Sequence, residues 1–275
     1  MQKYKAKVSS HELLAGSFQY LHLELVNPGR IEFISGQYII FNIDPSRGIC
    51  RNYSIASQPS MNHAVELLVD IKPGGPGSEF LKNLQSGKEI EFIGPFGSFI
   101  VHDDEQRTRA KGQGLRDNES IRGLIFVATG SGISPIRAMI LDLLINKKYQ
   151  DPIKLWWGMR NQEDCFWTED FDELEKDFSN FKWDLVLSNP PAGWPLHSGH
   201  VTEHVLDYVQ NRAKGQGPRD KGQTEPDNSL AFSPQPLALD TCFYLCGNRF
   251  MIDEVSTKLK ETGINGEHIH TEKFF

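Results

Sequence analysis

The sequence lacks long apolar runs, has few cysteines and carries too little positive charge for several classes of protein. No apolar segment of the 275 residues approaches the roughly 20 residues of a membrane-spanning helix, so we expect no membrane insertion. Met1 to Lys7 leads into no apolar core of a signal peptide, and we expect a cytoplasmic protein. The net charge of −7 argues against nucleic-acid binding, which needs a basic surface.

The four cysteines are scattered rather than clustered. Cys50 and Cys165 stand alone, and Cys242 and Cys246 form a C-x-x-x-C pair without the spacing of iron–sulfur ligands. We therefore expect no iron–sulfur module on this chain, and no structural disulfide in a reducing compartment. The histidines, His197 and His200 among them, lack a metal-like partner set, so we expect no metal site and most histidines in solvent.

The length and the residue pattern predict two domains. The 275 residues exceed a prior of about 100 to 200 residues per domain, and 17 Phe and 5 Trp supply apolar surface for cores. The first hundred residues alternate short β-rich runs with turn residues, which predicts a six-stranded antiparallel β-barrel or sandwich. The expected strands are Tyr4–Val8, Gln19–Leu25, Gln37–Ile43, Arg51–Ser57, Ala64–Ile71 and Glu89–Ile93.

From Leu124 onward, apolar strands alternate with helical segments, which predicts an α/β doubly wound parallel sheet. The expected strands are Leu124–Ala128, Ile153–Trp157, Trp183–Leu187 and Thr241–Cys246, and the expected helices are Pro135–Asn146, Thr168–Asp177, Val201–Gln210 and Arg249–Thr262. We expect a first domain over 1–105, an inserted linker over 106–122, and a second domain over 123–275 with an inserted flexible loop over 211–240.

Two nearly identical segments interrupt this pattern. Arg109–Asp117 and Arg212–Asp220 differ only at Leu115 and Pro218, and both are too rich in Gly, Lys and Gln to bury a core. We interpret them as surface insertions. Their basic residues leave a second interpretation open, in which they dock an acidic electron-transfer partner.

The segment R-N-Y-S-I-A-S at Arg51–Ser57 carries the clearest chemistry. In an extended strand, Arg51 and Tyr53 point to one side, while Ser54 points to the other. Arg51 offers a charge-assisted, bidentate contact to a phosphate, and Tyr53 offers a flat aromatic surface. The segment is suited to a large flat cofactor with a phosphate tail.

The motif order resembles the ferredoxin-NADP reductase superfamily. R-x-Y-S-x-x-S is similar to its flavin signature, and the later motifs follow in the same order. They are Lys72–Leu81 (K-P-G-G-P-G-S-E-F-L), Gly94–Phe99 (G-P-F-G-S-F), Val127–Pro135 (V-A-T-G-S-G-I-S-P), Gly158–Arg160, Tyr244–Met251 (Y-L-C-G-N-R-F-M) and the acidic-then-aromatic end Glu272–Phe275. The resemblance covers nearly the whole chain. It implies a flavin-binding barrel followed by an NAD(P)-binding α/β domain.

The resemblance assigns Ser54 to the flavin ring near N5, while Ser57 supports the backbone or the phosphate. In the stretch that begins at Lys72, glycines such as Gly77 allow close backbone approach, and we expect Ser78 to cap a helix beginning near Glu79. The pyrophosphate fits there. We expect FAD rather than FMN, because the family mostly uses the dinucleotide.

The second cofactor is expected where the strand Leu124–Ala128 ends. The expected contacts to the nucleotide phosphates come from Thr129, Gly130, Ser131, Gly132 and Pro135, although the loop is not a G-x-G-x-x-G fingerprint. The resemblance places Cys246, followed by Gly247, beside the nicotinamide. It gives Glu272 an orienting or proton-relay role and Phe274 or Phe275 a stacking role on the flavin. Arg160 could face the adenosine, and the absence of an arginine after Leu187 favours NADH while leaving NADPH open.

These features predict a flavoprotein that transfers hydride from NAD(P)H to FAD and passes electrons to a separate acceptor. The acceptor is a ferredoxin, an oxygenase component, or a diffusible acceptor such as free flavin or a ferric complex. The resemblance includes reductase components of oxygenases and flavin reductases without an iron–sulfur module. An alternative from another class is a flavin-loaded docking or redox-sensing subunit with little turnover of its own.

Overall fold

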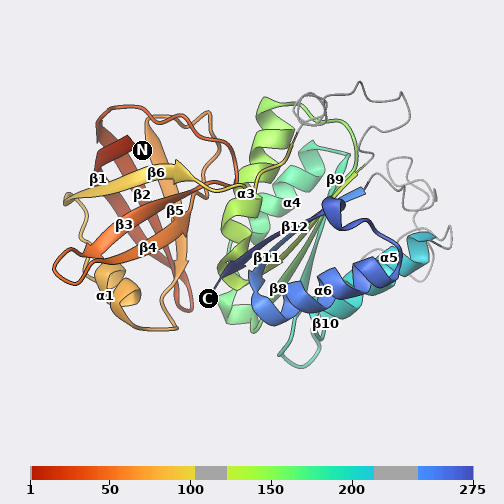
Figure 1. Ribbon diagram of the computed structural model, residues 1–275. Coiled ribbons are helices and arrows are strands. Elements are labelled where there is room, and N and C mark those ends of the chain that lie inside the picture. The colour runs from red at the N-terminus through yellow and green to blue at the C-terminus, as the bar shows by residue number, and fades with distance from the viewer. Residues whose placement is uncertain (1, 103–122, 214–240, 275) are drawn as a thin grey trace, which may run out of the picture. The chain divides into compact units, whose positions relative to one another are not determined.

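The computed structural model describes residues 2–102, 123–213 and 241–274, which form two compact units (Figure 1). The first unit comprises Met1–Val101 and Ile133–Tyr149, and the second comprises His102–Gly132 and Gln150–Phe275. The predicted linker 106–122, most of the repeated segments and Phe275 lie outside the described residues. So do residues 214–240 of the predicted loop 211–240, whereas residues 211–213 are helical rather than part of a loop. Each unit is described by itself below.

The first unit is built on a six-stranded antiparallel sheet in the order β4-β3-β6-β1-β2-β5. Its strands are β1 (Gln2–Ala15), β2 (Phe18–Asn27), β3 (Tyr38–Asp44), β4 (Ile49–Ser54), β5 (Ala64–Asp70) and β6 (Glu89–Phe96). All six predicted strands are present. The sheet closes on itself, because Ile55, directly after β4, forms a bridge with Leu67 on β5, the opposite edge strand. The closed sheet surrounds a core that includes Leu21, Leu23, Ile39, Phe41 and Phe92.

Two helices complete the first unit. The short α1 (Pro76–Lys82) lies near β3 and β4. Helix α3 (Ile133–Leu141) continues into a π-helical turn over Asp142–Asn146 and buries most of its side chains. A Cβ atom at Gly36 would lie only 2.3 Å from Met139 Cε on α3 and 2.0 Å from the Phe99 carbonyl oxygen. Glycine at position 36, with φ of 99°, therefore permits the helix to pack closely.

The second unit has a six-stranded sheet in the order β10-β9-β8-β7-β11-β12, with all pairings parallel. Its strands are β7 (Gly123–Thr129), β8 (Ile153–Met159), β9 (Phe181–Leu187), β10 (His197–Ser198), β11 (Thr241–Asn248) and β12 (Ile269–Phe274). The strand order reverses between β7 and β11. Parallel sheets bind ligands at the carboxyl ends of their strands beside such a reversal.

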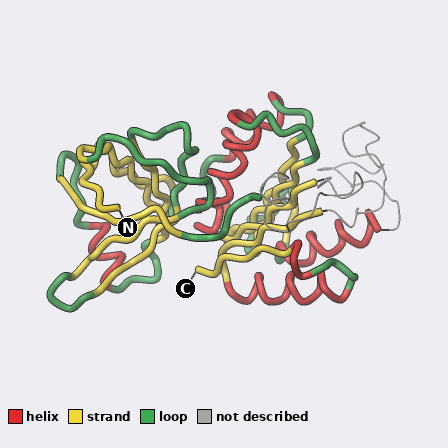
Figure 2. The backbone as a smooth tube through the Cα atoms, turned by 45° about the horizontal axis from the view of Figure 1, so that its top comes forward, coloured by secondary structure: helices red, strands yellow, loops and turns green. Residues whose placement is uncertain are grey.

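Helices cover both faces of this sheet (Figure 2). Helices α5 (Val201–Ala213) and α6 (Arg249–Glu261) share one apolar core with Trp156 of β8. Helix α4 (Thr168–Asp177) covers the opposite face, where Phe171 packs against Trp157 and Trp183. The adjacent residues Trp156 and Trp157 point to opposite faces, as alternation along a strand requires. The predicted doubly wound parallel sheet is confirmed.

Candidate functional site

The strand that carries R-N-Y-S-I-A-S meets the glycine-rich helix start in the first unit. A Cβ atom at Gly77 would lie 3.1 Å from the Tyr53 hydroxyl oxygen and 3.3 Å from Arg51 Cγ. Two motifs that are distant in sequence therefore converge on one surface. Arg51 is exposed, and its guanidinium donates a hydrogen bond to the Cys50 carbonyl at 2.7 Å. The remaining guanidinium donors suit a phosphate group.

Tyr53 presents an aromatic surface beside this arginine. Its ring is half-buried, and its centroid lies 5.5 Å from that of Phe41 in the barrel core. Burial raises the pKa of Tyr53 to about 12, and the nearby positive charge of Arg51 only partly opposes this effect. The phenol therefore stays neutral at ordinary pH, which suits contact with a flat conjugated ring.

Ser78 does not cap the helix, which corrects the sequence-based expectation. Helix α1 begins at Pro76 rather than near Glu79, with Gly75 as its N-cap and no side-chain capping bond. The buried Ser78 hydroxyl instead donates to the Gly74 carbonyl at 3.1 Å. Gly74 and Gly75 have φ of 72° and 86°, so this turn depends on glycine. Proline was overlooked as the helix start, although it commonly occupies the first helical position.

Three further predicted flavin-site residues lie at the end of β4 or in the segments that follow β4 and β5. Ser54 is the last residue of β4 and is buried. The buried Ser57 hydroxyl accepts a hydrogen bond from the Glu66 amide at 3.2 Å. Lys72 is exposed, and its amide donates to the Asp70 carboxylate at 2.9 Å. Ser57 therefore joins the segment after β4 to β5, and Lys72 lies in the turn directly after β5.

In the second unit, the loop after β7 interlocks with the end of β11. A Cβ atom at Gly132 would lie 2.3 Å from the Cys246 carbonyl oxygen, and one at Gly247 would lie 2.3 Å from Thr129 Oγ1. The Asn248 amide donates to the Thr129 hydroxyl at 2.8 Å. Both glycines are therefore required by close backbone contact, and they bring the two predicted motifs together at the reversal in strand order.

The other motif residues occupy the loop itself, the helix that follows it in the chain and the end of β8. The Trp157 indole donates to the Gly130 carbonyl at 3.2 Å, and Ser131 is half-buried. Pro135 lies in the first turn of α3, which continues directly from Gly132 in the chain. Arg160 is exposed just beyond β8, and its carbonyl accepts the Asn189 amide at 2.8 Å. The ends of β8 and β9 are thus joined beside the exposed guanidinium.

Cys246 and Glu272 lie opposite each other on β11 and β12. Burial raises the pKa of the Cys246 thiol well above its usual value, and the Glu272 charge adds to the increase. Cys246 is therefore a neutral, space-filling group rather than a nucleophile. Phe274 is half-buried and pairs in register with Asn248. The strand β12 was not predicted, and it is the element that brings Glu272 to the carboxyl end of β11.

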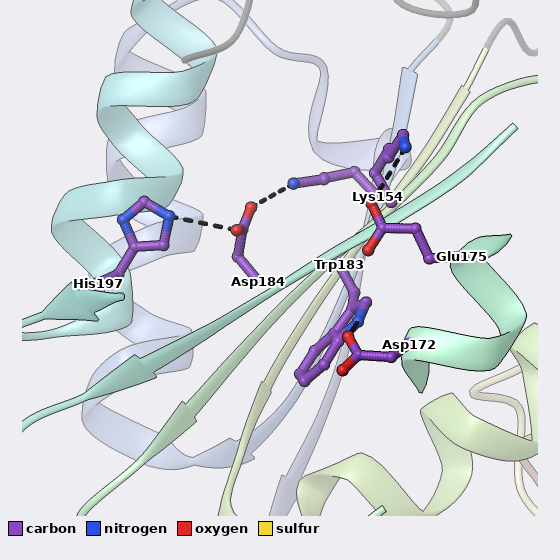
Figure 3. Close-up of polar contacts among 7 residues, drawn as sticks. Lys154, Asp172, Glu175, Trp183, Asp184 and His197 are labelled. Atoms are coloured by element: carbon purple, nitrogen blue, oxygen red, sulfur yellow. Dashed lines mark hydrogen bonds and ion pairs between the residues drawn. The ribbon is translucent and has the colours of Figure 1, made fainter. Parts of the chain in front are cut away.

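A buried charge cluster lies on the sheet away from this edge (Figure 3). Asp184 on β9 pairs with Lys154 on β8 through one carboxylate oxygen, and its other carboxylate oxygen lies 3.2 Å from His197 Nε2. His197 was expected in a loop, but it lies in β10, which pairs with β9 and brings its ring to the buried carboxylate. Gly158 of β8 pairs with Thr129, where the glycine loop begins. Lys154 lies four positions before Gly158, which is about 13 Å along the strand. The cluster therefore supports the sheet rather than the glycine loop.

Other absences concern only the described part of the chain. There, no group of three or more His, Cys, Asp or Glu side chains is arranged to hold a metal ion. No helix in the described ranges has the length and apolar character needed to cross a membrane. All four cysteines are free thiols.

Comparison with known proteins matches two successive parts of the chain, and α3 of the first unit falls within the second match. Residues 5–100 match the family model of the oxidoreductase FAD-binding domain, and residues 126–257 match that of the oxidoreductase NAD-binding domain. The chain is 30% identical to the phenol hydroxylase P5 protein of Acinetobacter pittii (strain PHEA-2) over 100% of this chain and 66% of that protein. It is 27% identical to terephthalate 1,2-dioxygenase reductase component 1 of a Comamonas species, over 99% of this chain and 68% of the relative.

Solved structures share the fold. The Amycolatopsis cytochrome P450 reductase GcoB matches with a TM-score of 0.76 and 21% identity, over 99% of this chain and 70% of that one. A Neisseria gonorrhoeae ferredoxin NADP+ reductase with bound FAD and NADP matches with a TM-score of 0.73 and 17% identity, over 100% of both chains.

The residues present fit these cofactors. The close approach of Gly77 to Arg51 and Tyr53 leaves a cationic and aromatic surface for a flavin with its phosphates. Gly132 and Gly247 pack closely together and carry no side chains, so the loop at the carboxyl ends of the strands exposes its backbone. An exposed backbone of this kind suits the phosphates of a nucleotide. The chain thus belongs to the ferredoxin-NADP reductase superfamily and carries an FAD-binding domain followed by an NAD-binding domain.

Proposed function

We propose that the protein is an NAD(P)H-dependent, flavin-containing reductase that delivers electrons to a separate acceptor. The observation that carries the proposal is the interlocked contact of Gly247 with Thr129, because it leaves the backbone bare where a nucleotide would bind beside Cys246. FAD, when bound, supplies the hydride acceptor for the nicotinamide. The protein residues bind, orient and exclude water.

In this proposal, Arg51 holds the flavin phosphate, Tyr53 lies against the ring system, and Ser54 presents its hydroxyl near the reacting edge. The α1 start at Gly77 and Ser78 lets the backbone approach the phosphates, and Lys72 adds positive charge nearby. Phe274 covers the ring until nicotinamide arrives. The role of Phe274, which belongs to the second unit, rests on the resemblance of the C-terminal motif, and the other assignments rest on positions within the first unit.

The nucleotide is held by the loop Thr129–Gly132 and by the following helix at Pro135. Cys246 sets the position of the nicotinamide by steric contact, because its thiol is neutral and buried. Glu272 orients the ring or holds a proton at its carboxylate. Arg160 faces the adenosine. Ser188 and Asn189 follow β9 without an arginine for a 2′-phosphate, so we propose NADH as the preferred donor.

We propose an oxygenase component or a ferredoxin as the acceptor. Two of the relatives are named as parts of phenol hydroxylase and terephthalate dioxygenase systems. The chain spans 66% and 68% of those relatives. The four cysteines of this chain are free, and the spacing of their sequence positions does not match iron–sulfur ligation. The electrons would therefore pass from FAD to a centre outside the residues of this chain.

The proposal is tested with apoprotein reconstituted separately with FAD and FMN. Oxidation of NADH and of NADPH is followed with ferricyanide as an artificial acceptor. A Gly132→Ala variant is measured beside it, because the added Cβ would lie 2.3 Å from the Cys246 carbonyl oxygen and would displace the nucleotide loop. We expect turnover with FAD, a preference for NADH, and loss of turnover without loss of FAD in the variant. Tight flavin binding without oxidation of either nucleotide would instead favour a docking or sensing subunit.

A further inference from the structure

A closed ring of contacts in the first unit holds the segment directly after β4. The Ala56 amide donates to the Glu66 carbonyl at 2.8 Å, and Arg137 on α3 donates to the Ala56 carbonyl at 3.2 Å. Arg137 Nη1 also lies 3.6 Å from the Glu66 carboxylate, which completes the ring. The Ser134 hydroxyl on α3 donates to the Ser54 carbonyl at 3.0 Å. Both carbonyl groups are therefore fixed in direction.

The centre of the ring is the Glu66 carboxylate. The side chains of Glu66 and Arg137 are only 12% and 15% exposed, and His22 Nδ1 lies 3.4 Å from the same carboxylate. Burial raises the pKa of Tyr20 far above its usual value, and the charge of Glu66 and a hydrogen bond to it add to the increase. Glu66 thus interacts with two cationic or titratable partners and with a phenol that stays protonated.

A contribution to folding stability alone does not explain why Glu66 and Arg137 form a buried ion pair. A buried ion pair often contributes no more to folding than a well-packed apolar pair of the same size. What apolar residues cannot reproduce is the direction of a donor toward one carbonyl group. Arg137 contacts the Ala56 carbonyl and the Glu66 carboxylate together, so the pair fixes the peptide that follows Ala56.

We propose that Glu66 and Arg137 are positioning residues for FAD. They fix the segment from Ser54 to Ser57, and through it they set both the affinity for FAD and the reduction potential of the bound cofactor, without touching it. The inference rests on the proposed placement of FAD beside Ser54. It adds residues that lie outside all the motifs of the sequence.

The test uses Glu66→Gln, which keeps the shape and removes the charge, together with Arg137→Met and Arg137→Lys. The matched control is Glu91→Gln, because Glu91 pairs with Lys3 on the same barrel at 2.8 Å but is exposed. FAD binding to each apoprotein is titrated by flavin fluorescence, and the midpoint potential of each holoprotein is measured by dye-linked reduction.

We expect Glu66→Gln and Arg137→Met to weaken FAD binding by about tenfold, the size of one lost hydrogen bond to a charged group. The midpoint potential should shift in both variants, and Arg137→Lys should recover part of the loss. The Glu91→Gln control should match the unmodified protein. A double variant should lose less than the sum of the single losses, because both residues act through one ring.

Unchanged affinity and potential in variants that lose only thermal stability would overturn the inference. If the Glu66 and Arg137 variants fail to fold, Ser134→Ala provides the second test, because it removes only the donor to the Ser54 carbonyl. A shift of potential in that variant supports the inference, and no shift contradicts it. Unmodified protein that binds no FAD would instead contradict the proposed function, so the two failures are distinguishable.

Discussion

The sulfur of Cys246 lies 4.0 Å from a carboxylate oxygen of Glu272 on the neighbouring parallel strand. A thiol that is both buried and next to a carboxylate resists ionisation. The pair therefore places a neutral, compact group and an acid side by side at the carboxyl end of β11. This is the chemistry expected of a surface that orients a ring rather than one that attacks it.

We predict that Cys246 is alkylated much more slowly than Cys50 in the folded protein. Cys50 is exposed, whereas Cys246 is buried and its pKa is raised by burial and by Glu272. Only the thiolate reacts with iodoacetamide. Mass spectrometry of the labelled peptides at pH 8 measures both rates in one sample. Equal rates would show that Cys246 is accessible and ionised, contrary to its assigned steric role.

Gly247→Ala should weaken nucleotide binding and lower stability by about 2 kcal/mol or more, since overpacking adds to the cost of a positive φ. The added Cβ would lie 2.6 Å from the Thr129 carbonyl oxygen. Gly263→Ala is the control, because Gly263 has a φ of 92° but nothing within 4 Å. The Gly263→Ala change should lower the free energy of unfolding by about 1 kcal/mol and leave nucleotide binding intact. Urea unfolding measures the stability of each variant, and NADH titration measures its nucleotide affinity. Equal results for the two variants would contradict the importance of the close contact at Gly247.

Arg51→Lys should weaken FAD binding by about tenfold, because a lysine cannot make the bidentate contact of a guanidinium. Arg47→Lys serves as the control, since Arg47 is exposed in the turn before β4 and lies 4.0 Å from Asp44. Equilibrium titration of the apoproteins with FAD measures both. Unchanged affinity for FAD in the Arg51 variant would show that Arg51 does not bind the flavin phosphate.

Asp184 should make stability depend on acid pH. Burial opposes ionisation, but Lys154 and His197 outweigh it, and the net effect is to lower the pKa of Asp184 in the folded protein. The resulting stabilisation is fully present above the unfolded pKa of about 3.9 and is lost as the pH falls through the lower folded value. Unfolding should therefore become easier below about pH 4, in the window between the two pKa values.

Asp184→Asn tests this dependence, because it leaves Lys154 buried without its partner. We expect a loss of about 3 to 5 kcal/mol at pH 7 and a flatter stability profile in the acid range. Asp253→Asn is the control, since Asp253 is exposed although it also pairs with a lysine, Lys273. Urea unfolding between pH 3 and pH 7 provides the measurement. An unchanged acid profile in the Asp184 variant would show that another carboxylate dominates.

The strands and helices were largely predictable because their periodicity is local. Helix α4 has the predicted bounds, Thr168–Asp177, with acidic residues in its first turn and a lysine in its last. Strand β12 was missed because its sequence, I-H-T-E-K-F, is short and polar. Such an edge strand can be identified from its pairing with β11 in the structure, but not from the pattern of its own residues.

Residues of the site were predictable only where they belong to a sequence motif. Gly77, Arg51 and Tyr53 belong to motifs of the first unit, and the resemblance predicted that these motifs share one cofactor. The same holds for Gly132 and Gly247 in the second unit. Glu66 and Arg137 belong to no motif, and they meet only because the barrel closes between Ile55 and Leu67. His197 reaches Asp184 only after β10 pairs with β9. Contacts that depend on such long-range closure have no local signal in the sequence.

Anaerobic stopped-flow absorbance tests the central claim most directly. The FAD-loaded protein is mixed separately with NADH and NADPH, and the loss of the flavin absorption band is recorded in time. Rapid bleaching by NADH, with slower bleaching by NADPH, is the predicted result. Bound FAD that neither nucleotide bleaches would contradict the assignment of this chain as an NAD(P)H-dependent reductase.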